Sequence, residues 1–279
     1  MTRETPASTA EATRRYYETS DVDGFYAAVW GGEDIHTGIY ADPRESIATA
    51  SRRTVAHLAA KASGRLGAGG TVLDLGSGYG GAARYLADRF GCQVVALNIS
   101  ERQNQRHRET NAERGLAGLI DVVTGSFQQI PCPDGTFDVV WSQEALCHSG
   151  DRATVLTEAA RVLKPDGRLL FTDVMAADDC PPETLRPVIA RLGIEALATP
   201  GFYHEQLARL GLASAEFEDL TGHLLTHYLR LAEETAQHRE DLVRVISPAY
   251  LDQLDDNLAR WIDACRDGRL RWGVFAGQR

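Results

Sequence analysis

The chain has 279 residues, of which 43% are apolar and 24% are charged, so a disordered, collagenous or coiled-coil protein is excluded. This length accommodates one large α/β domain or one domain with an elaborated cap. Lysine and arginine number 29 against 39 aspartate and glutamate residues. The net charge of −10 argues against a nucleic-acid partner, because such binding depends on clustered cations.

The chain shows no membrane or export signal. No stretch approaches the roughly 18 consecutive apolar residues that a membrane helix requires, and the N-terminal segment is polar, without the apolar core of a signal peptide. We therefore expect a cytoplasmic protein with no membrane partner. The five cysteines contain no C-x-x-C pair, which predicts reduced, packed thiols and no metal site. The sequence carries no indication of an oligomeric state.

Short apolar runs alternate with segments of helical periodicity in the middle of the chain. The runs are Thr71–Leu75, Gln93–Ile99, Ile120–Thr124, Phe137–Ser142 and Arg168–Val174. Runs that are apolar throughout are typical of parallel strands covered on both faces. Between them lie helical stripes, such as the one from Ala83 to Phe90 that Gly91 can end. This alternation predicts right-handed βαβ units and hence a Rossmann-like, doubly wound, mainly parallel α/β sheet.

Three segments of different character divide the chain. Residues 1–60 are rich in aromatic side chains and predict an N-terminal helical lid, while residues 61–176 form the Rossmann-like core. Residues 177–279 are mainly helical by period and include two late strands, Ser214–Leu220 and Leu270–Ala276. Because the long helices enter late, we expect a cap over the carboxyl ends of the strands, where open α/β sheets bind ligands.

The most informative stretch is Val72-Leu-Asp-Leu-Gly-Ser-Gly-Tyr-Gly-Gly81, which joins a strand to a helix. Its glycines permit positive φ and close backbone approach, and the helix directs its first amides toward a ligand. Gly76, Gly78 and Gly81 fit the dinucleotide pattern G-x-G-x-x-G, which alone is a weak signal. Asp74 would repel a pyrophosphate but suits a cationic ligand that carries an ammonium group. A nicotinamide-binding domain and a non-catalytic binding module stay as alternatives.

The pattern D-x-G-x-G-x-G resembles motif I of the class I S-adenosylmethionine-dependent methyltransferases. Asn98, about twenty residues on, stands where a ribose-binding side chain belongs, although most methyltransferases carry Asp or Glu there. Ser100 and Gln103 form a capping-box start, and Gly125-Ser-Phe127 resembles the adenine-contacting loop. The resemblance implies S-adenosylmethionine as cofactor and S-adenosylhomocysteine as product. The residues it implies for cofactor binding are Asp74, Gly76, Ser77, Gly78, Asn98, Ile99, Gln103, Ser126, Phe127 and Gln143.

Longer stretches resemble the sarcosine/dimethylglycine N-methyltransferases, which make glycine betaine. They include the segments Phe25–Tyr40, Leu97–Asn104 and His148–Arg152. This resemblance implies a small amine as methyl acceptor. The chain departs from that family at Glu144, where Asp is usual, and at Val174, where Pro is usual. These departures keep a natural-product C- or O-methyltransferase, for example one acting on an electron-rich indole ring, as the alternative.

Three residues are candidates for catalysis. His148 follows the fourth predicted strand, and its imidazole can titrate near working pH, which makes it the candidate base. Antibiotic sugar O-methyltransferases resemble this segment and imply a partner carboxylate at Asp173. Glu144 could hold a cationic acceptor or abstract a proton. Each of the three has a structural alternative. His148 could order its loop, Asp173 could cap the end of its strand, and Glu144 could be a surface carboxylate.

An aromatic lid is the candidate acceptor site. Tyr17, Tyr26 and Trp30 lie in the N-terminal segment, and each could contribute about 0.5–2 kcal/mol of cation–π attraction to a sulfonium or methylated ammonium. His36 lies in the same segment, and Met175 is expected to shape the pocket. Plain hydrophobic helix contacts and a hydrogen-bonded loop histidine are the alternatives for these residues.

Overall fold

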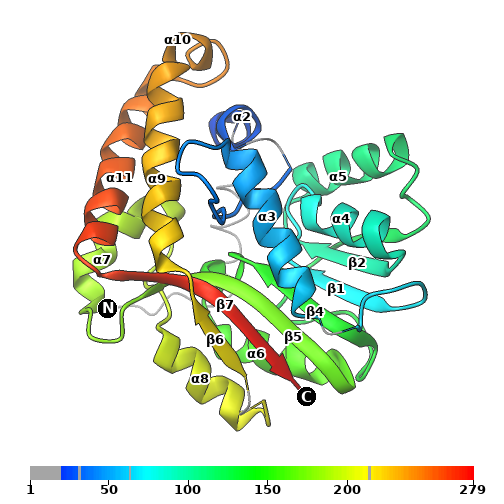
Figure 1. The fold of residues 1–279 in the computed structure, drawn as a ribbon. Helices are drawn as coiled ribbons and strands as arrows, with labels where there is room; N and C mark the ends of the chain where they lie inside the picture. Colours follow the sequence, from blue (N-terminus) through cyan, green and yellow to red (C-terminus); the bar gives the residue numbers. More distant parts are fainter. Residues whose placement is uncertain (1–19, 31–32, 63, 213–214) are drawn as a thin grey trace.

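A seven-stranded sheet organises the molecule (Figure 1). The computed structural model describes residues 20–30, 33–62, 64–212 and 215–279. The strands are β1 (Thr71–Leu75), β2 (Gln93–Asn98), β3 (Ile120–Thr124), β4 (Phe137–Gln143), β5 (Leu163–Ala176), β6 (Glu216–Asp219) and β7 (Leu270–Gln278), in the order β3-β2-β1-β4-β5-β7-β6. Strands β1 to β5 pair in parallel, and β7 runs antiparallel between β5 and β6. The predicted doubly wound, mainly parallel α/β sheet is confirmed.

Helices cover both faces of this sheet. They are α2 (Ser20–Val29), α3 (Ile47–Ala60), α4 (Gly81–Phe90), α5 (Glu101–Glu113), α6 (Arg152–Val162), α7 (Pro182–Ile189), α8 (Pro200–Arg209), α9 (Thr221–Gln237), α10 (Arg239–Leu242) and α11 (Pro248–Arg266). Neighbouring strand residues serve opposite faces, as the two-residue period requires. Val72 packs in a cluster with α3 and α4, whereas Leu73 packs in a cluster with α6 and α8. Continuous apolar runs in the sequence therefore reflect burial on both sides.

The strand bounds agree closely with the sequence pattern except at β5, β6 and β7. Strand β6 ends at Asp219 rather than at the predicted Leu220. Strand β5 begins at Leu163 rather than Arg168, because Leu163 already pairs with Phe137 ahead of a register shift. Residues 164–167 therefore form a bulge inside the strand, where Asp166 adopts a φ of +63°. Strand β7 continues to Gln278 because it pairs with β5 along its whole length.

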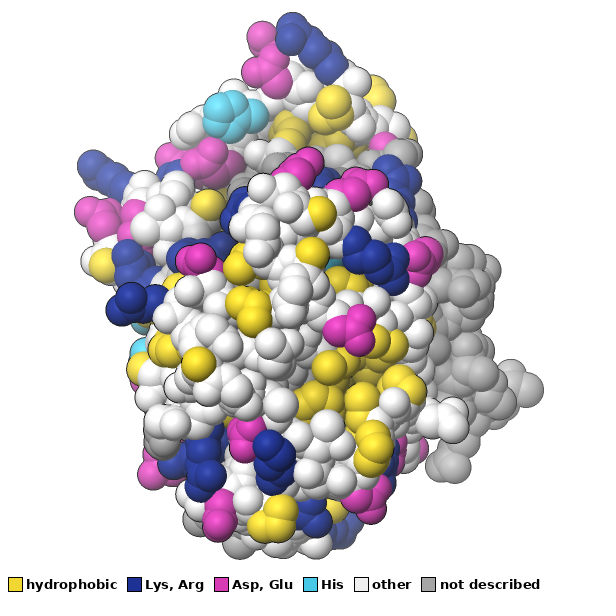
Figure 2. Space-filling model, turned by 90° about the vertical axis from the view of Figure 1, so that its right-hand side faces the viewer, with side chains coloured by type: hydrophobic (Ala, Val, Ile, Leu, Met, Phe, Trp, Pro, Cys, Tyr) yellow, Lys and Arg dark blue, Asp and Glu magenta, His cyan; other side chains and the backbone are white. Residues whose placement is uncertain are grey.

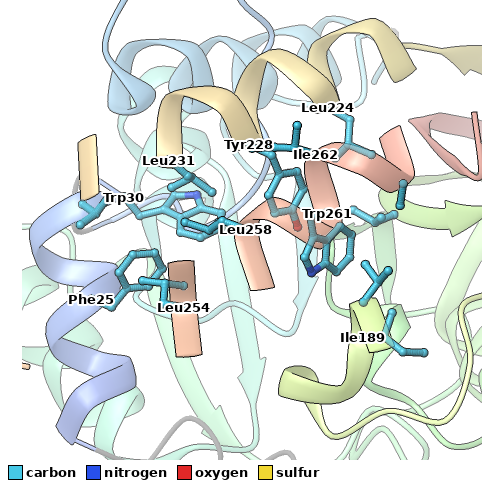
Figure 3. Packing of buried hydrophobic residues seen from close by; sticks show 14 of the residues in the cluster. Phe25, Trp30, Ile189, Leu224, Tyr228, Leu231, Leu254, Leu258, Trp261 and Ile262 are labelled. Atoms are coloured by element: carbon cyan, nitrogen blue, oxygen red, sulfur yellow. The ribbon is translucent and has the colours of Figure 1, made fainter. Parts of the chain in front are cut away.

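A helical cap rises from one end of the sheet, where α9 and α11 lie side by side with α10 at their tip (Figure 1). Figure 3 shows its core, in which Phe25 and Trp30 from the N-terminal segment meet Leu231 of α9 and Leu254 of α11. Tyr228 stacks on Trp261 at 4.6 Å between ring centroids. The N-terminal and C-terminal segments therefore share one hydrophobic cluster.

The described surface mixes charges of both signs. On the face in Figure 2, Lys and Arg side chains alternate with Asp and Glu rather than gathering into a patch of one sign. In the described part of the chain, no helix combines the length and the apolar character that a membrane span requires.

Candidate active site

The glycine loop between β1 and α4 is as tightly built as its sequence suggests. Gly76, Gly78 and Gly80 have φ values of +75°, +53° and +82°, a region that side chains with a Cβ rarely adopt. A Cβ on Gly76 would lie 2.2 Å from the Cβ of Ala145, and one on Gly80 would lie 1.9 Å from Nε2 of His107. The loop is thus packed from both sides, and its backbone is presented to the cavity beside it.

That cavity runs along the carboxyl ends of β1, β2 and β4, and the empty space in it, including the open solvent at its mouth, is about 710 Å³. Eight of the ten residues expected to bind cofactor line it, together with two of the three catalytic candidates. The eight are Gly76, Gly78, Asn98, Ile99, Gln103, Ser126, Phe127 and Gln143, and the two are Glu144 and His148. Asp74 lies two residues before Gly76, and Ser77 lies between Gly76 and Gly78; neither of them lines the cavity. One cavity therefore joins segments spread over more than seventy residues of sequence.

Four buried polar atoms without a partner in the described part of the chain belong to the cavity wall or to the glycine-loop stretch, two from the wall residues Gln103 and Gln143 and two from Asp74 and Ser77. Oδ2 of Asp74, Oγ of Ser77, Nε2 of Gln103 and Nε2 of Gln143 each lack a hydrogen-bond partner among the described residues. An unmet buried polar atom costs about 1–3 kcal/mol, so such groups normally have a partner. The set comprises an acid, a hydroxyl and two amide donors, which fits a polar, cationic cofactor with an amino-acid end and a ribose.

Asp74 carries the strongest electrostatic signal in the site. Burial raises the pKa of its carboxyl to about 7, while the nearby His36 opposes the rise and Asp34 adds to it. His36 lies 3.8 Å from Asp34, measured from Nε2 to Oδ1. The pKa of His36 is raised by Asp34 and Glu144 against the effect of its own burial. A cation placed beside Asp74 would favour its ionised form.

Asn98 belongs to a network of side-chain amides at the end of β2. Its Nδ2 donates to Oε1 of Gln103 at 3.0 Å and to Oδ1 of Asn104 at 3.1 Å. Asn104 in turn donates to Oγ1 of Thr124 at 2.8 Å. Because the Asn98 nitrogen is used inside the protein, its carbonyl oxygen is the group left to accept from a ligand. Nε2 of Gln103 adds a donor beside it.

Glu144 lines the cavity directly after β4, and β1 lies between β4 and the strand that ends at Asn98. It follows β4 with a φ of +50°, and its carboxylate accepts from the backbone N of Thr37 at 2.6 Å, from Oγ1 of Thr37 at 3.0 Å and from Nε1 of Trp272 at 3.1 Å. Burial raises its pKa, whereas His36 and these donors oppose the rise. Glu144 is the single carboxylate among the described residues that line the cavity.

His148 and Asp173 are held in different ways. Burial lowers the pKa of His148 to about 4, and Arg152 and Arg191 reinforce the shift, so the imidazole is neutral at working pH. Asp173 is fully buried, and its Oδ2 accepts from the hydroxyl of Tyr203 at 2.5 Å. Burial raises the pKa of Asp173 to about 6. The proposed orientation of His148 by Asp173 stays a prediction, because the identified partner of this carboxylate is Tyr203.

The residues expected to bind the acceptor lie outside the cavity wall, as far as they are described. The ring centroids of Tyr26 and Trp30 lie 5.0 Å apart, and Nε1 of Trp30 donates to the carbonyl oxygen of His36 at 3.1 Å. Met175 is buried in the core cluster of α6 and α8. Tyr17 falls outside the described residues. Their contact with an acceptor stays a prediction.

Several wall residues were missed by sequence reasoning. They are Ile35, Gln128, Ala145, Ser149 and Gly150. The hydrogen-bond donors that hold the Glu144 carboxylate were also missed; they are Thr37 and Trp272, which are 107 and 128 positions away in the sequence. No local motif marks such distant partners. Within the described ranges, no three His, Cys, Asp or Glu side chains gather as a set of metal ligands.

Comparisons with known proteins identify the family of the chain. Residues 73–171 match the methyltransferase domain family. A sarcosine/dimethylglycine N-methyltransferase of Halorhodospira halochloris is 46% identical over 95% of each chain, and that of Aphanothece halophytica is 44% identical over 95% of this chain and 96% of its own. A solved structure assigned as a sarcosine dimethylglycine methyltransferase from Galdieria sulphuraria has a TM-score of 0.85 and 36% identity, covering 96% of this chain and 98% of that one.

Fold, site and likeness together define an S-adenosylmethionine-dependent methyltransferase that acts on a small molecule. The alternative of a nicotinamide-binding domain is thereby set aside. The chain belongs to the family that includes the sarcosine/dimethylglycine N-methyltransferases.

Proposed function

We propose that this chain methylates the nitrogen of a small amine that carries a carboxylate, with sarcosine or dimethylglycine as the acceptor. The observation that carries the proposal is identity of 44–46% along nearly the full length of two enzymes named for these acceptors. The structure adds a cavity whose described lining offers one carboxylate, Glu144, which follows β4 and is separated by β1 from Asn98 at the end of β2. A carboxylate in that place suits the positive charge that develops on the nitrogen of a neutral amine as it takes up the methyl group.

Cofactor binding is assigned to the residues around the glycine loop. The proposed set is Asp74, Gly76, Ser77, Gly78, Asn98, Ile99, Gln103, Ser126, Phe127 and Gln143. In this proposal Asp74 balances the positive charge of the amino-acid end, while Asn98 accepts from a ribose hydroxyl and Gln103 donates to one. When bound, the cofactor supplies a sulfonium methyl group for in-line displacement by a nucleophile about 3–3.5 Å away.

The protein's own task is then to position a nitrogen lone pair and to keep water out. Glu144 is fixed by three hydrogen bonds, so it can orient an acceptor without rearranging. His148, neutral because burial holds its pKa near 4, can accept a hydrogen bond from the acceptor. An amine that arrives deprotonated needs no strong base, so the weak basicity of His148 is compatible with N-methylation.

A transfer assay tests the proposal. The purified enzyme is incubated with methyl-labelled S-adenosylmethionine and with sarcosine, dimethylglycine, indoles or phenols in parallel. We expect label in dimethylglycine from sarcosine and in betaine from dimethylglycine. Betaine itself serves as the control acceptor, because its nitrogen has no lone pair. Label in indoles or phenols without label in either amine would contradict the proposal and establish the C- or O-methylation alternative.

A further inference from the structure

A short segment, residues 33–40, lies across the glycine loop and is called the strap here. A Cβ on Gly81 would lie 2.1 Å from Oδ1 of Asp34 and 2.7 Å from the carbonyl of Glu33. A Cβ on Gly78 would lie 3.5 Å from Cδ1 of Ile35. Ile35 lines the same cavity as Gly76 and Gly78. The strap therefore forms one wall of the cofactor site and touches the loop that binds the cofactor.

Residues 36–38, the downstream half of the strap, are held by hydrogen bonds that are buried or partly buried. The carbonyl of His36 accepts from Nε1 of Trp30 at 3.1 Å and from Oγ of Ser51 at 2.8 Å. The backbone N of Thr37 donates to Glu144, and that of Gly38 donates to Nδ1 of His227 at 3.3 Å. These bonds lie largely away from solvent, so salt screens them little.

The upstream end is held by charge instead. Glu33 faces three arginines from three different places: Arg52 of α3 at 3.6 Å, Arg84 of α4 at 3.3 Å, and Arg114, which caps the end of α5. Asp34 adds a second contact to Arg52 at 3.0 Å. One carboxylate thus ties the strap to the three helices that surround the glycine loop.

The arginines differ in exposure, and this decides how the contact responds to salt. The side chain of Arg84 is 3% exposed, whereas those of Glu33 and Arg114 are 26% and 49% exposed. Arg84 otherwise donates to Oδ1 of Asn111 at 3.3 Å, and its Nε has no partner among the described residues. The cluster is buried enough to matter energetically and open enough for ions to screen it.

We propose that Glu33 is a positioning residue that latches the strap over the bound cofactor through Arg52, Arg84 and Arg114, and thereby sets the rate at which cofactor leaves. The inference requires S-adenosylmethionine as the cofactor, and it does not depend on which molecule accepts the methyl group. It predicts that salt speeds cofactor release by weakening the upstream end of the strap while the downstream half stays bonded.

The test measures release of labelled S-adenosylmethionine from the full-length enzyme after addition of excess unlabelled S-adenosylhomocysteine. Glu33→Gln keeps the shape of the side chain and removes its charge. We expect release about tenfold faster than in the wild type at low salt, equivalent to about 1.4 kcal/mol. Raising ionic strength from about 0.01 M to 1 M shortens the screening length from about 30 Å to about 3 Å. It should speed release in the wild type and leave Glu33→Gln almost unchanged.

Glu218→Gln is the matched control. Glu218 also lies in a surface ion pair with Lys61 and contacts the imidazole of His57, and it is not among the residues that line the cavity. Its variant should release cofactor at the wild-type rate with the wild-type salt response. Wild-type release by Glu33→Gln, or equal acceleration in both variants, would overturn the proposal. If Glu33→Gln does not fold, Arg114→Gln replaces it: this exposed partner should give about two- to threefold faster release, and no change there would likewise overturn the latch.

Discussion

The two ends of the cavity are built from different kinds of sequence. At the cofactor end, Gly76 and Gly78 come from one continuous loop, and Asn98 and Gln103 from the next strand and helix. At the end that we propose for the acceptor, Glu144 accepts hydrogen bonds from Thr37 of the strap and from Trp272 of the last strand. The residues of the first end are close in sequence, and they follow the general arrangement in which a strand, a glycine loop and a helix N-terminus bind a ligand. The second end exists only after the whole chain has folded.

This difference implies that the two ends can be damaged separately. A change in the glycine loop should abolish cofactor binding whatever the acceptor. A change at Glu144 should alter acceptor use while cofactor affinity stays intact.

Gly76→Val should remove the cofactor end altogether. The new Cβ would lie 2.2 Å from the Cβ of Ala145 at a φ of +75°, so the loop must move or the strand end must open. We expect cofactor affinity to fall by at least about 100-fold, because a displacement of about 1 Å in such a site is already costly. Equilibrium titration with S-adenosylhomocysteine measures it.

Gly135→Val separates crowding from backbone strain in that experiment. Gly135 has a similar φ of +61°, but no atom lies within 4 Å of its Cβ position in the described structure. This variant should lose about 1–2 kcal/mol of stability through strain alone and bind cofactor as the wild type does. Equal loss of affinity in both variants would show that the close packing of the loop is not what binding requires.

Asp74→Asn should weaken cofactor binding by about 30-fold while stabilising the free enzyme at high pH. The carboxyl is buried with a pKa raised to about 7, above its ordinary 3.8, so ionising it destabilises the folded state. The folded protein holds this proton more tightly than the unfolded chain, and wild-type stability therefore falls as pH rises from about 4 to 7. Asparagine lacks this penalty.

Unfolding in urea at two pH values checks the sign. The stability advantage of Asp74→Asn over the wild type, without cofactor, should grow by about 2–3 kcal/mol between about pH 5 and pH 8. Titration with S-adenosylhomocysteine gives the affinity. A constant difference between the two pH values would mean that Asp74 is not buried without a partner in the free enzyme.

The sequence predicts the features that are formed by residues close together in the chain, and it does not predict those that need residues from distant segments. Strand β1 and the loop from Gly76 to Gly81 are local, so their periodicity and glycines predict them to the residue. The bulge at Asp166 depends on pairing with Phe137 across the sheet, which no local pattern carries. In the site, Gln103 and Gln143 followed from motif positions, whereas Ile35 entered the wall only because the strap folds back over the loop.

Glu144→Gln tests the acceptor end. The amide can keep the two bonds to Oε1 from Thr37 and Trp272, but it removes the charge facing the acceptor. We expect kcat/KM for dimethylglycine to fall about tenfold, in line with about 1.4 kcal/mol for one charge interaction. The cofactor dissociation constant should change less than about twofold. Glu144→Asp is the companion variant, since it retains the charge with a shorter reach.

The pair of variants distinguishes charge from geometry. If Glu144→Asp keeps most of the activity, the charge is what the acceptor recognises. If Glu144→Asp is as slow as Glu144→Gln, the bonds to Thr37 and Trp272 set the geometry. A fall in cofactor affinity as large as the fall in kcat/KM would break the proposed independence of the two ends.

His148→Gln should have the smallest effect. Burial, Arg152 and Arg191 lower the pKa of His148 to about 4, so it is neutral throughout the range in which an amine acceptor loses its proton. A base this weak takes little part in removing a proton from an ammonium group, and glutamine can still offer a hydrogen-bond acceptor at that place. We expect turnover with dimethylglycine to fall less than about fivefold, and the pH profile of wild-type kcat to lack an ionisation near 6.5. A loss of about 10²–10⁴-fold would instead make His148 the general base. It would also favour an acceptor that must give up a proton in the transition state, such as a hydroxyl or an indole, over an amine.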